Sequence, residues 1–585
     1  MFKKESKQYY FIILFMSVLV LVSILRALPA FNYSAHYIDE EYIVYPAVGF
    51  LGYDFNPRLF VYHTLPMYIL SFIYFIIYAL YYIVGLVSSK IEFISLLFQD
   101  DSIYFISANL LFGFVYTLGC FVLSLIVYKH FTSKIGAVIF LLVTLLPSDS
   151  YAASTIARVD NFVFLFLTLT IYFCCFAPKK FSSFMLSVIF CCAAFTSKFP
   201  AIVFFPILFI KIVHDIYEGN YPKKYLIYFF ITIPIITFLF MPYMFLDFSS
   251  YKSVLTLVIA RSSGTFSWVG HVQYDNTWQK LYRLYELLIS QSGILSVIGT
   301  CLFVLYSLIW NKKMIFPWLF VSTYIASFST SSIISDWWLR PVYPFFIFFT
   351  VVLLTRLKNM EIVYNHIKKP LLYKHINNIL FINKYIIYFM IAGYYIFIFQ
   401  GSLSKYYYSL EKRDDTRVIS NVWIQKYIPE NATILLDGIV NYLPNVFSND
   451  KKTNQIITAV FRMGRQKNEI LNKGFEFYFS KYYGKYINYN IRLLRYTAFS
   501  ENLKLINKDD YIVISSMSYD RFFKKHTMDK FPQRTKEAIE YYSLIKKQKH
   551  IISFKGRGPI ISIYQMQTNG EELRETLIKK ISEGL

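Results

Sequence analysis

Repeated apolar runs, each long enough to cross or nearly cross a lipid bilayer, constrain this chain more than any other feature. A transmembrane helix needs about 20 consecutive, mostly apolar residues. Runs that reach or approach this length lie at 10–28, 65–87, 102–128, 135–150, 161–177, 184–197, 201–213, 225–245, 287–310, 314–331, 341–355 and 378–399. This pattern predicts a polytopic α-helical membrane protein.

The composition agrees with a membrane location. Of the 585 residues, 56% are hydrophobic and only 16% are charged, against about 25% charged in an average soluble domain. The net charge of +23 comes from small basic clusters between apolar runs, which argues against nucleic-acid binding. Such clusters suit contact with anionic membrane lipid and with a phosphate-bearing ligand. No cysteine follows Cys301, so a C-terminal domain needs no disulfide.

Basic residues beside the apolar runs predict the orientation, because Lys and Arg are retained on the cytoplasmic side. The first run follows Lys3, Lys4 and Lys7 and has the features of a retained signal anchor, so the N-terminus is expected in the cytoplasm. Every basic loop is cytoplasmic if 65–87 dips into or lies along the outer leaflet, which leaves about eleven crossings plus juxtamembrane helices. We expect a multi-pass protein of a bacterial cell (inner) membrane.

The character of the sequence changes near residue 400. Residues 1–400 are expected to form a transmembrane domain, whereas 401–585 contain no spanning run and are expected to form a periplasmic or extracellular α/β domain. The expected strands are Ala432–Leu436, Tyr511–Ser515 and Pro559–Tyr564, and the expected helices are Arg417–Tyr427 and Arg534–Lys546.

Two acidic residues follow the first apolar run on the predicted outer face. Asp39 and Glu40 lie about a dozen residues beyond its end. A carboxylate at the membrane surface can accept a proton from an acceptor hydroxyl, and an adjacent acid can orient it. The alternative is a pair of solvated juxtamembrane acids.

Basic side chains at predicted outer ends of apolar runs form a second group, which comprises Arg58, Arg158, Lys198 and Arg340. Such cations can bind a lipid-linked phosphate and stabilise it as a leaving group. They can equally extend to lipid headgroups, and Arg158 can form a structural pair with Asp160. His271, near Asp275, is a weaker candidate for a divalent metal ligand, together with Asp160.

Several short motifs follow one another in a particular order. They are the acidic pair Asp39-Glu40, Asn56-Pro-Arg-Leu-Phe-Val-Tyr-His-Thr-Leu-Pro66, Ala157-Arg-Val-Asp160, Pro242-Tyr-Met-Phe-Leu-Asp247 and Arg340-Pro-Val-Tyr-Pro344. In the tail, Asp415-Thr-Arg417, Trp423-Ile424, Tyr511-Ile-Val-Ile-Ser-Ser516 and Gly558-Pro559 continue the series.

In this order the motifs resemble the GT-C membrane glycosyltransferases, specifically the phospholipid-carrier-dependent family related to protein mannosyltransferases and aminoarabinose transferases. The resemblance covers nearly the whole chain. One departure is His63-Thr-Leu-Pro66, where many relatives have a Pro-Pro pair after the His or Lys. No catalytic role is therefore assigned to His63.

The resemblance implies transfer of a sugar from a polyprenyl-phosphate donor to an acceptor hydroxyl on the outer face, with inversion. Asp39 would be the general base and Glu40 an orienting residue. Arg58, Arg158, Lys198 and Arg340 would bind the donor phosphate, and Asp160 would shape the pocket. No cofactor is required, although a divalent metal is compatible. The acceptor stays open among glycan, lipid and protein.

Two alternatives remain beside this interpretation. A transporter or flippase of lipid-linked sugars predicts ionisable residues lining a path within the spans, whereas most charges here lie at span ends. A scaffold whose outer domain only binds glycan would not need the charged motif residues.

Overall fold

The computed structural model describes residues 38–364, except 59, 100, 132, 146–156, 264–273, 275 and 311–313. It also describes residues 416–583, except 438–442, 445, 447–467, 483–488, 495–497, 531 and 557–558, and the isolated residues 17, 20 and 21. Most of the first apolar run and the predicted boundary at 400 therefore lie outside the described residues.

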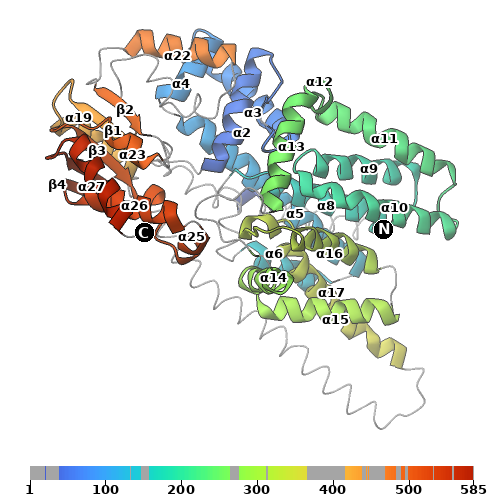
Figure 1. Cartoon of the computed structure of the whole chain (residues 1–585). Helices are drawn as coiled ribbons and strands as arrows, with labels where there is room; N and C mark the ends of the chain where they lie inside the picture. Colours follow the sequence, from blue (N-terminus) through green and yellow to red (C-terminus); the bar gives the residue numbers. More distant parts are fainter. Residues whose placement is uncertain are drawn as a thin grey trace.

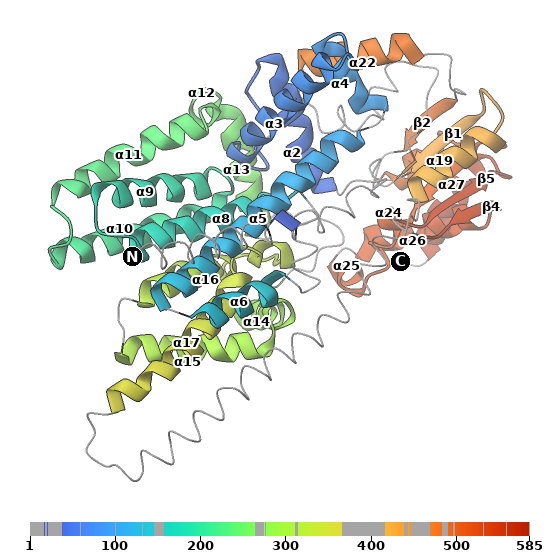
Figure 2. The ribbon, with the colours of Figure 1, turned by 180° about the vertical axis from the view of Figure 1, so that it is seen from behind.

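Residues 38–364 form helices throughout their described part (Figures 1 and 2). In chain order these are α2 (Ile38–Gly49), η2 (Phe50–Gly52), α3 (Leu65–Ile83), α4 (Lys90–Gln99), α5 (Ser102–Phe131), α6 (Lys134–Leu145), α8 (Asp160–Ile171), the π-helical turn η3 (Tyr172–Phe176), α9 (Phe181–Phe195), η4 (Phe199–Val203), α10 (Phe204–Tyr217), α11 (Lys224–Phe240), α12 (Tyr243–Leu246), α13 (Phe248–Ser262), α14 (Thr277–Ser292), α15 (Ile294–Trp310), α16 (Ile315–Ser329), η6 (Asp336–Leu339) and α17 (Tyr343–Tyr364).

Long apolar helices support a membrane location. Among the described residues, three helices are long and apolar enough to cross a bilayer, namely α3, α5 and Phe199–Tyr217. A fourth span results if the bent pair α14 and α15 is counted as one. By length and composition α3 therefore qualifies as a full crossing, whereas the sequence favoured an outer-leaflet position for 65–87. The count of eleven crossings stays a prediction.

Apolar side chains cover both the inside and the outside of this helical body. One large cluster joins buried residues of α5, α8, α9 and α17, with Phe164, Val188 and Phe348 at 0–1% exposure. On α11, by contrast, Ile227, Phe230 and Leu239 are each about 60% exposed. Large apolar residues on an outer helix face are typical of contact with lipid.

Residues 416–583 contain every strand of the described chain. They form a five-stranded sheet in the order β2-β1-β3-β5-β4, with β1 (Thr433–Asp437), β2 (Asn490–Leu494), β3 (Tyr511–Ser515), β4 (Lys549–Phe554) and β5 (Ile561–Gln565). Strands β2, β1 and β3 are parallel, while β5 is antiparallel to β3 and to β4.

Helices cover both faces of this sheet. They are α19 (Thr416–Tyr427), α22 (Glu469–Tyr482), α23 (Phe499–Leu503), α24 (Ser516–Tyr519), α25 (Lys525–Lys530), α26 (Pro532–Lys546) and α27 (Gly570–Glu583), of which α22 lies away from the sheet (Figure 1). Alternation along β1 places Leu435 in one apolar cluster with α26 and α27, and Leu436 in another with α19. The predicted α/β fold of this region is confirmed, but β2 and β4 were missed.

A buried carboxyl group lies at the end of β1. Asp437 is 1% exposed, and burial raises its pKa from the ordinary value of 3.8 to about 7. Between these two pH values the folded chain holds a proton that the unfolded chain has lost. Stability therefore falls as the pH rises from about 4 to about 7 and stays reduced above that range.

We predict that Asp437→Asn removes this pH dependence and stabilises the sheet at pH 8 by up to about 4 kcal/mol, the energy equivalent of that pKa difference. Hydrogen exchange of the β1 and β3 amides in the full chain, corrected for intrinsic rates, measures this stabilisation and its pH dependence. The exposed Asp529→Asn in α25 is the matched control. Equal protection of wild type and Asp437→Asn at pH 8 would contradict the prediction.

Candidate active site

The first turn of α2 carries the predicted acidic pair. The backbone of Asp39 lies in α2, and its side chain lies outside the described part of the chain. The side chain of Glu40 is 1% exposed, and its Oε1 accepts a hydrogen bond of 2.9 Å from the backbone N–H of Ala157. Because Ala157 directly precedes Arg158, this bond joins α2 to the segment with the predicted Arg158 and Asp160. Two of the segments predicted to share the outer face thus meet.

An ion pair fixes the beginning of α8. The Lys198 Nζ lies 2.6 Å from Asp160 Oδ1, and the two side chains are 12% and 3% exposed. Helix α9 packs beside α8 and brings Lys198, three residues beyond its last residue, back to the start of α8. The sequence left a pair between Arg158 and Asp160 open, and the structure instead gives Asp160 the more distant Lys198.

The two buried arginines lie just before neighbouring helices. Arg158 is 4% exposed and precedes α8, and Arg340 is 7% exposed and precedes α17. Near the start of each helix, Phe164 of α8 and Phe345 of α17 pack with ring centroids 5.8 Å apart. This ring contact joins α8 to α17, and the N-terminus of each helix carries the positive end of a helix dipole.

Described residues of the 56–66 motif join the ends of several helices. Asn56 Nδ2 donates to Asp247 Oδ2 at 2.9 Å, which holds the pKa of that carboxyl group below its ordinary value. Thr64 Oγ1 donates to the carbonyl of Phe240, and the N–H of Leu65 donates to the carbonyl of Thr196. The Asn56–Pro66 and Pro242–Asp247 motifs are thus in direct contact, a pairing that neither motif indicates by itself.

His63 has a structural role in this segment. Burial lowers its pKa to about 4, so the ring is neutral at physiological pH. Its Nδ1 lies 2.6 Å from the carbonyl oxygen of Phe195, and since a carbonyl only accepts, Nδ1 carries the proton. The rings of Phe195, Phe199 and Tyr251 surround it. These contacts agree with assigning no catalytic role to His63.

Arg58 lies at the edge of the site. Its side chain is 38% exposed and forms an ion pair of 2.5 Å with Asp54. Its backbone is left-handed, with φ at 54°, and its N–H donates to Asn56 Oδ1 at 2.9 Å. Arg58 is therefore joined to the site through Asn56, whereas Arg158 and Arg340 are buried within it.

Sequence reasoning did not identify Tyr324 of α16. Its ring is fully buried and stacks on Phe204, and the side chain is within electrostatic range of Asp160. Its hydroxyl has no hydrogen-bond partner in the part of the chain that the structure describes. No sequence signal marks Tyr324, because it stands in an ordinary apolar run.

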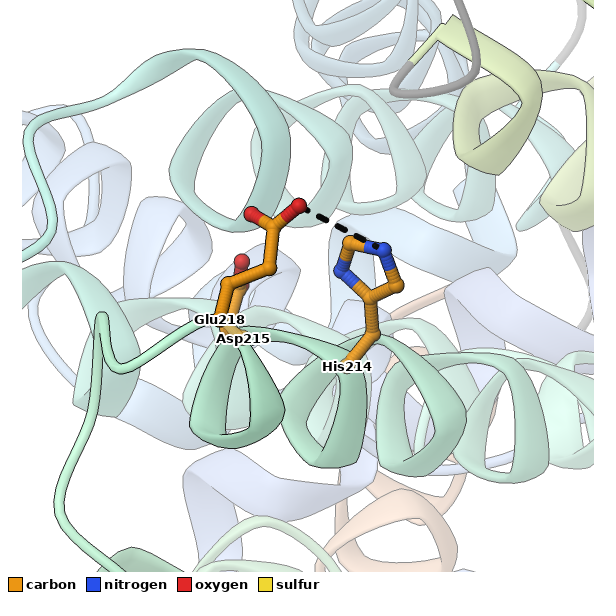
Figure 3. A group of neighbouring side chains, drawn as sticks. All are labelled: His214, Asp215 and Glu218. Atoms are coloured by element: carbon orange, nitrogen blue, oxygen red, sulfur yellow. Dashed lines mark ion pairs between the residues drawn. The ribbon is translucent and has the colours of Figure 1, made fainter.

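The acidic and histidine groups that could hold a metal lie elsewhere. Within the described ranges one group has suitable proximity, formed by His214, Asp215 and Glu218, whose ligand atoms lie within 4.8 Å of one another. In Figure 3 the imidazole of His214 and the carboxylate of Glu218 point toward each other, 3.7 Å apart. Asp215 already pairs with Lys211 at 2.6 Å and Lys179 at 2.9 Å, so a metal would have to displace two ammonium groups.

This group lies at the end of α10 that is remote from Lys198, so it does not belong to the site around Asp160. The predicted metal candidates His271 and Asp275 lie outside the described residues. A metal ligand role for Asp160 stays a prediction.

The comparisons with known proteins give structural similarity only. No protein-family model and no curated protein sequence matches the chain. It resembles ArnT from Cupriavidus metallidurans in the apo state, with 12% identity, a TM-score of 0.49, and coverage of 95% of this chain and 98% of that one. For the same protein bound to undecaprenyl phosphate the values are 11%, 0.46, 94% and 98%.

It also resembles the archaeal oligosaccharyltransferase AglB from Archaeoglobus fulgidus, in complex with an inhibitory peptide and a dolichol-phosphate. The identity is 10%, the TM-score 0.47, and coverage is 95% of this chain and 74% of that one. ArnT and AglB are both GT-C glycosyltransferases, the class that the sequence motifs resemble. All these TM-scores are below 0.5, so the function is inferred below from this chain's own residues.

The buried pair predicts a non-additive effect on stability. Lys198→Met leaves the Asp160 carboxylate buried without its cation, and we expect a loss of about 3–5 kcal/mol. In Asp160→Asn with Lys198→Met neither charge remains, so the double variant should be more stable than Lys198→Met alone. Thermal unfolding in lipid nanodiscs compares the stability of the wild type, the single variants Lys198→Met and Asp160→Asn, and the double variant.

Lys504→Met provides the control, because the Lys504–Glu501 pair is 39% and 64% exposed and should contribute less than about 1 kcal/mol. If the stability lost in the double variant equals the sum of the losses in Lys198→Met and Asp160→Asn, the two side chains are not coupled.

Proposed function

We propose that this protein is a membrane glycosyltransferase that moves a sugar from a polyprenyl-phosphate donor to an acceptor hydroxyl on the outer face, with inversion at the anomeric carbon. One observation carries the proposal. Ionisable side chains from separate parts of the sequence are largely buried where apolar helices begin or end, namely Glu40, Arg158, Asp160, Lys198 and Arg340, and direct contacts join Glu40 to Ala157 and Asp160 to Lys198. Burying charge at such places is costly, and it marks functional sites in membrane proteins.

The two buried arginines suit a phosphate that departs with a lipid chain. A guanidinium group can bind two phosphate oxygens at once, and it keeps its charge when buried. The N-termini of α8 and α17 add backbone N–H groups and positive dipole ends beside Arg158 and Arg340. Lys198 and Arg58, whose charges are paired with Asp160 and Asp54, would join only by exchanging partners.

The reaction needs a base, a positioned acceptor and a stabilised leaving group. We assign the base to Asp39, which would take the proton of the acceptor hydroxyl as its oxygen forms a bond to the anomeric carbon. The bond from that carbon to the phosphate oxygen breaks on the opposite side, which inverts the configuration. The polyprenyl phosphate leaves with the electron pair, and Arg158 and Arg340 would stabilise its negative charge.

Glu40 would act through position rather than through proton transfer. Because its Oε1 accepts the N–H of Ala157, it holds the first turn of α2 beside Arg158. Asp39 and the phosphate-binding arginines would then keep a fixed separation, and fixed separation of base and leaving group is a large part of catalysis by positioning. A glycan, a lipid and a protein are all candidate acceptors.

The test of this function is sugar transfer from a panel of radiolabelled polyprenyl-phosphate sugars, using purified protein in lipid. We predict that the wild type consumes one donor and that Asp39→Asn lowers the rate by about 100-fold or more, since general base catalysis contributes about 10²–10⁴. Asp529→Asn, the same chemical change on an exposed residue of α25, should leave the rate unchanged.

The two main alternatives give other results in this assay. Donor that moves across the bilayer without transfer, equally in both proteins, would favour a flippase. Transfer that is equal in wild type and Asp39→Asn would support the reaction and exclude Asp39 as the base.

A second prediction concerns metal ions. If the arginines neutralise the leaving phosphate, EDTA should change the transfer rate by less than about twofold, because one departing phosphate carries no more charge than two guanidinium groups can neutralise. Restoration of a lost rate by Mg²⁺ or Mn²⁺ would instead show that a metal shares this role. Dialysis against buffer without EDTA is the control.

A further inference from the structure

Helix α22 belongs in sequence to the sheet-containing region but packs against the helical body. It lies between β1 and β2 in the chain and beside α4 in space, a position visible in both views (Figures 1 and 2). Its neighbours also include α2 and η2. A connection between two parallel strands usually covers the sheet, so its position on another part of the molecule requires an explanation.

Apolar and ionic contacts join α22 to α4. The ring of Phe475 packs edge-on against Phe98, with centroids 5.4 Å apart. Leu471 is 4% exposed and belongs to the apolar cluster that contains the buried residues of α2 and α4. At the end of α22, Lys481 Nζ lies 3.3 Å from Glu92 Oε1.

Two glycines show how closely the elements approach. A Cβ atom on Gly474 of α22 would lie 2.6 Å from Ile94 Cγ2, 3.2 Å from its Cβ and 3.4 Å from its backbone carbonyl carbon. Ile94 is fully buried, so turning its Cγ2 atom away from a new methyl group would press the side chain into other core atoms. A Cβ on Gly49, the last residue of α2, would lie 2.5 Å from Asn468 Nδ2, just before α22.

Helix α2 is consequently held at both ends. At its start Glu40 is bonded to Ala157, and at its end Gly49 lies directly against Asn468. Pro46 removes one backbone hydrogen bond of this 12-residue helix, but the remaining bonds and the burial of Val44, Ala47 and Val48 allow it to transmit a displacement from one end to the other. A shift of α22 therefore moves the turn that carries Asp39 and Glu40.

We infer that α22, with Asn468, is a clamp by which the sheet-containing region positions α2 and its acidic pair for catalysis. The inference rests on the proposed glycosyltransferase function. The residues of the clamp are positioning residues, since they act through α2 and touch neither substrate. A shift of about 1 Å in a catalytic group can lower a rate about 100-fold, so modest packing changes here should be visible in kcat.

Gly474→Ala tests the clamp in the full chain. Alanine favours helix formation relative to glycine, so any harm must come from the contact with Ile94. Ile94→Ala removes the Cγ2 atom that the new methyl group would meet, and the double variant should therefore regain function. Gly556→Ala is the control, because among the described residues its Cβ would meet Thr416 Cγ2 alone, at an ordinary 3.7 Å.

Two measurements separate docking from catalysis. For docking, Glu92→Cys and Lys481→Cys are joined by a short bismaleimide in a Cys301→Ser background, since Cys301 is the exposed native cysteine. For catalysis, kcat and KM are measured with the polyprenyl-phosphate donor whose sugar the wild type transfers.

We expect Gly474→Ala to lower cross-linking and to reduce kcat about 10- to 100-fold with little change in KM, and Ile94→Ala to restore both. Unchanged cross-linking in Gly474→Ala would overturn the close packing. Reduced cross-linking with unchanged kcat would overturn the positioning role while the proposed function stands.

Absence of transfer in the wild type with every donor would overturn the proposed function, and with it the catalytic role of the clamp. The cross-linking yield of the protein with Glu92→Cys, Lys481→Cys and an intact Gly474 would still decide whether α22 docks on α4. A high yield supports the docking, and no yield overturns it.

Discussion

The hydrogen bond from the N–H of Ala157 to Glu40 determines how the predicted site is assembled. A carboxylate that is 1% exposed must find hydrogen-bond donors, because an unsatisfied buried charge costs several kcal/mol. A backbone N–H is a donor whose position is fixed by the main chain, so this bond sets the place of α2 relative to α8. Asp160 then completes the segment by binding Lys198, and the ends of α2, α8 and α9 become a single unit.

The sequence indicated these residues through their position at the ends of apolar runs, and it predicted that the acidic pair and Arg158 lie on the same outer face. It also predicted β1, β3, β5, α19 and α26 to within about two residues, because period-2 and period-3.6 patterns are local properties. The strands β2 and β4 were not predicted. Arg492 in β2 and the pair Lys549-His550 in β4 interrupt the apolar pattern, as is common on the edge strands of a sheet.

The sequence identified residues of the predicted site more readily than it identified which residues contact one another. Four cations were recognised at the ends of apolar runs, but the pairing of Asp160 with Lys198 depends on how α9 packs beside α8, and no local pattern encodes that packing. The same holds for Asn56 and Asp247, which are separated by 191 residues and belong to motifs that were noted individually. The position of α22 on α4 depends on Gly474 and Ile94, neither of which carries a recognisable signal.

The distribution of buried charge also bears on the choice between transfer and transport. A second charged group, with Lys179, Lys211 and Asp215, lies at the far end of the α8–η3 helix from Asp160. The helix between the two groups buries Phe162, Val163, Phe164, Leu165 and Leu167, together with the uncharged polar Thr168 and Thr170. A translocation path for a charged sugar phosphate would need ionisable groups along its length. Along α8, charge is instead confined to the ends, an arrangement that suits chemistry carried out at one face of a membrane.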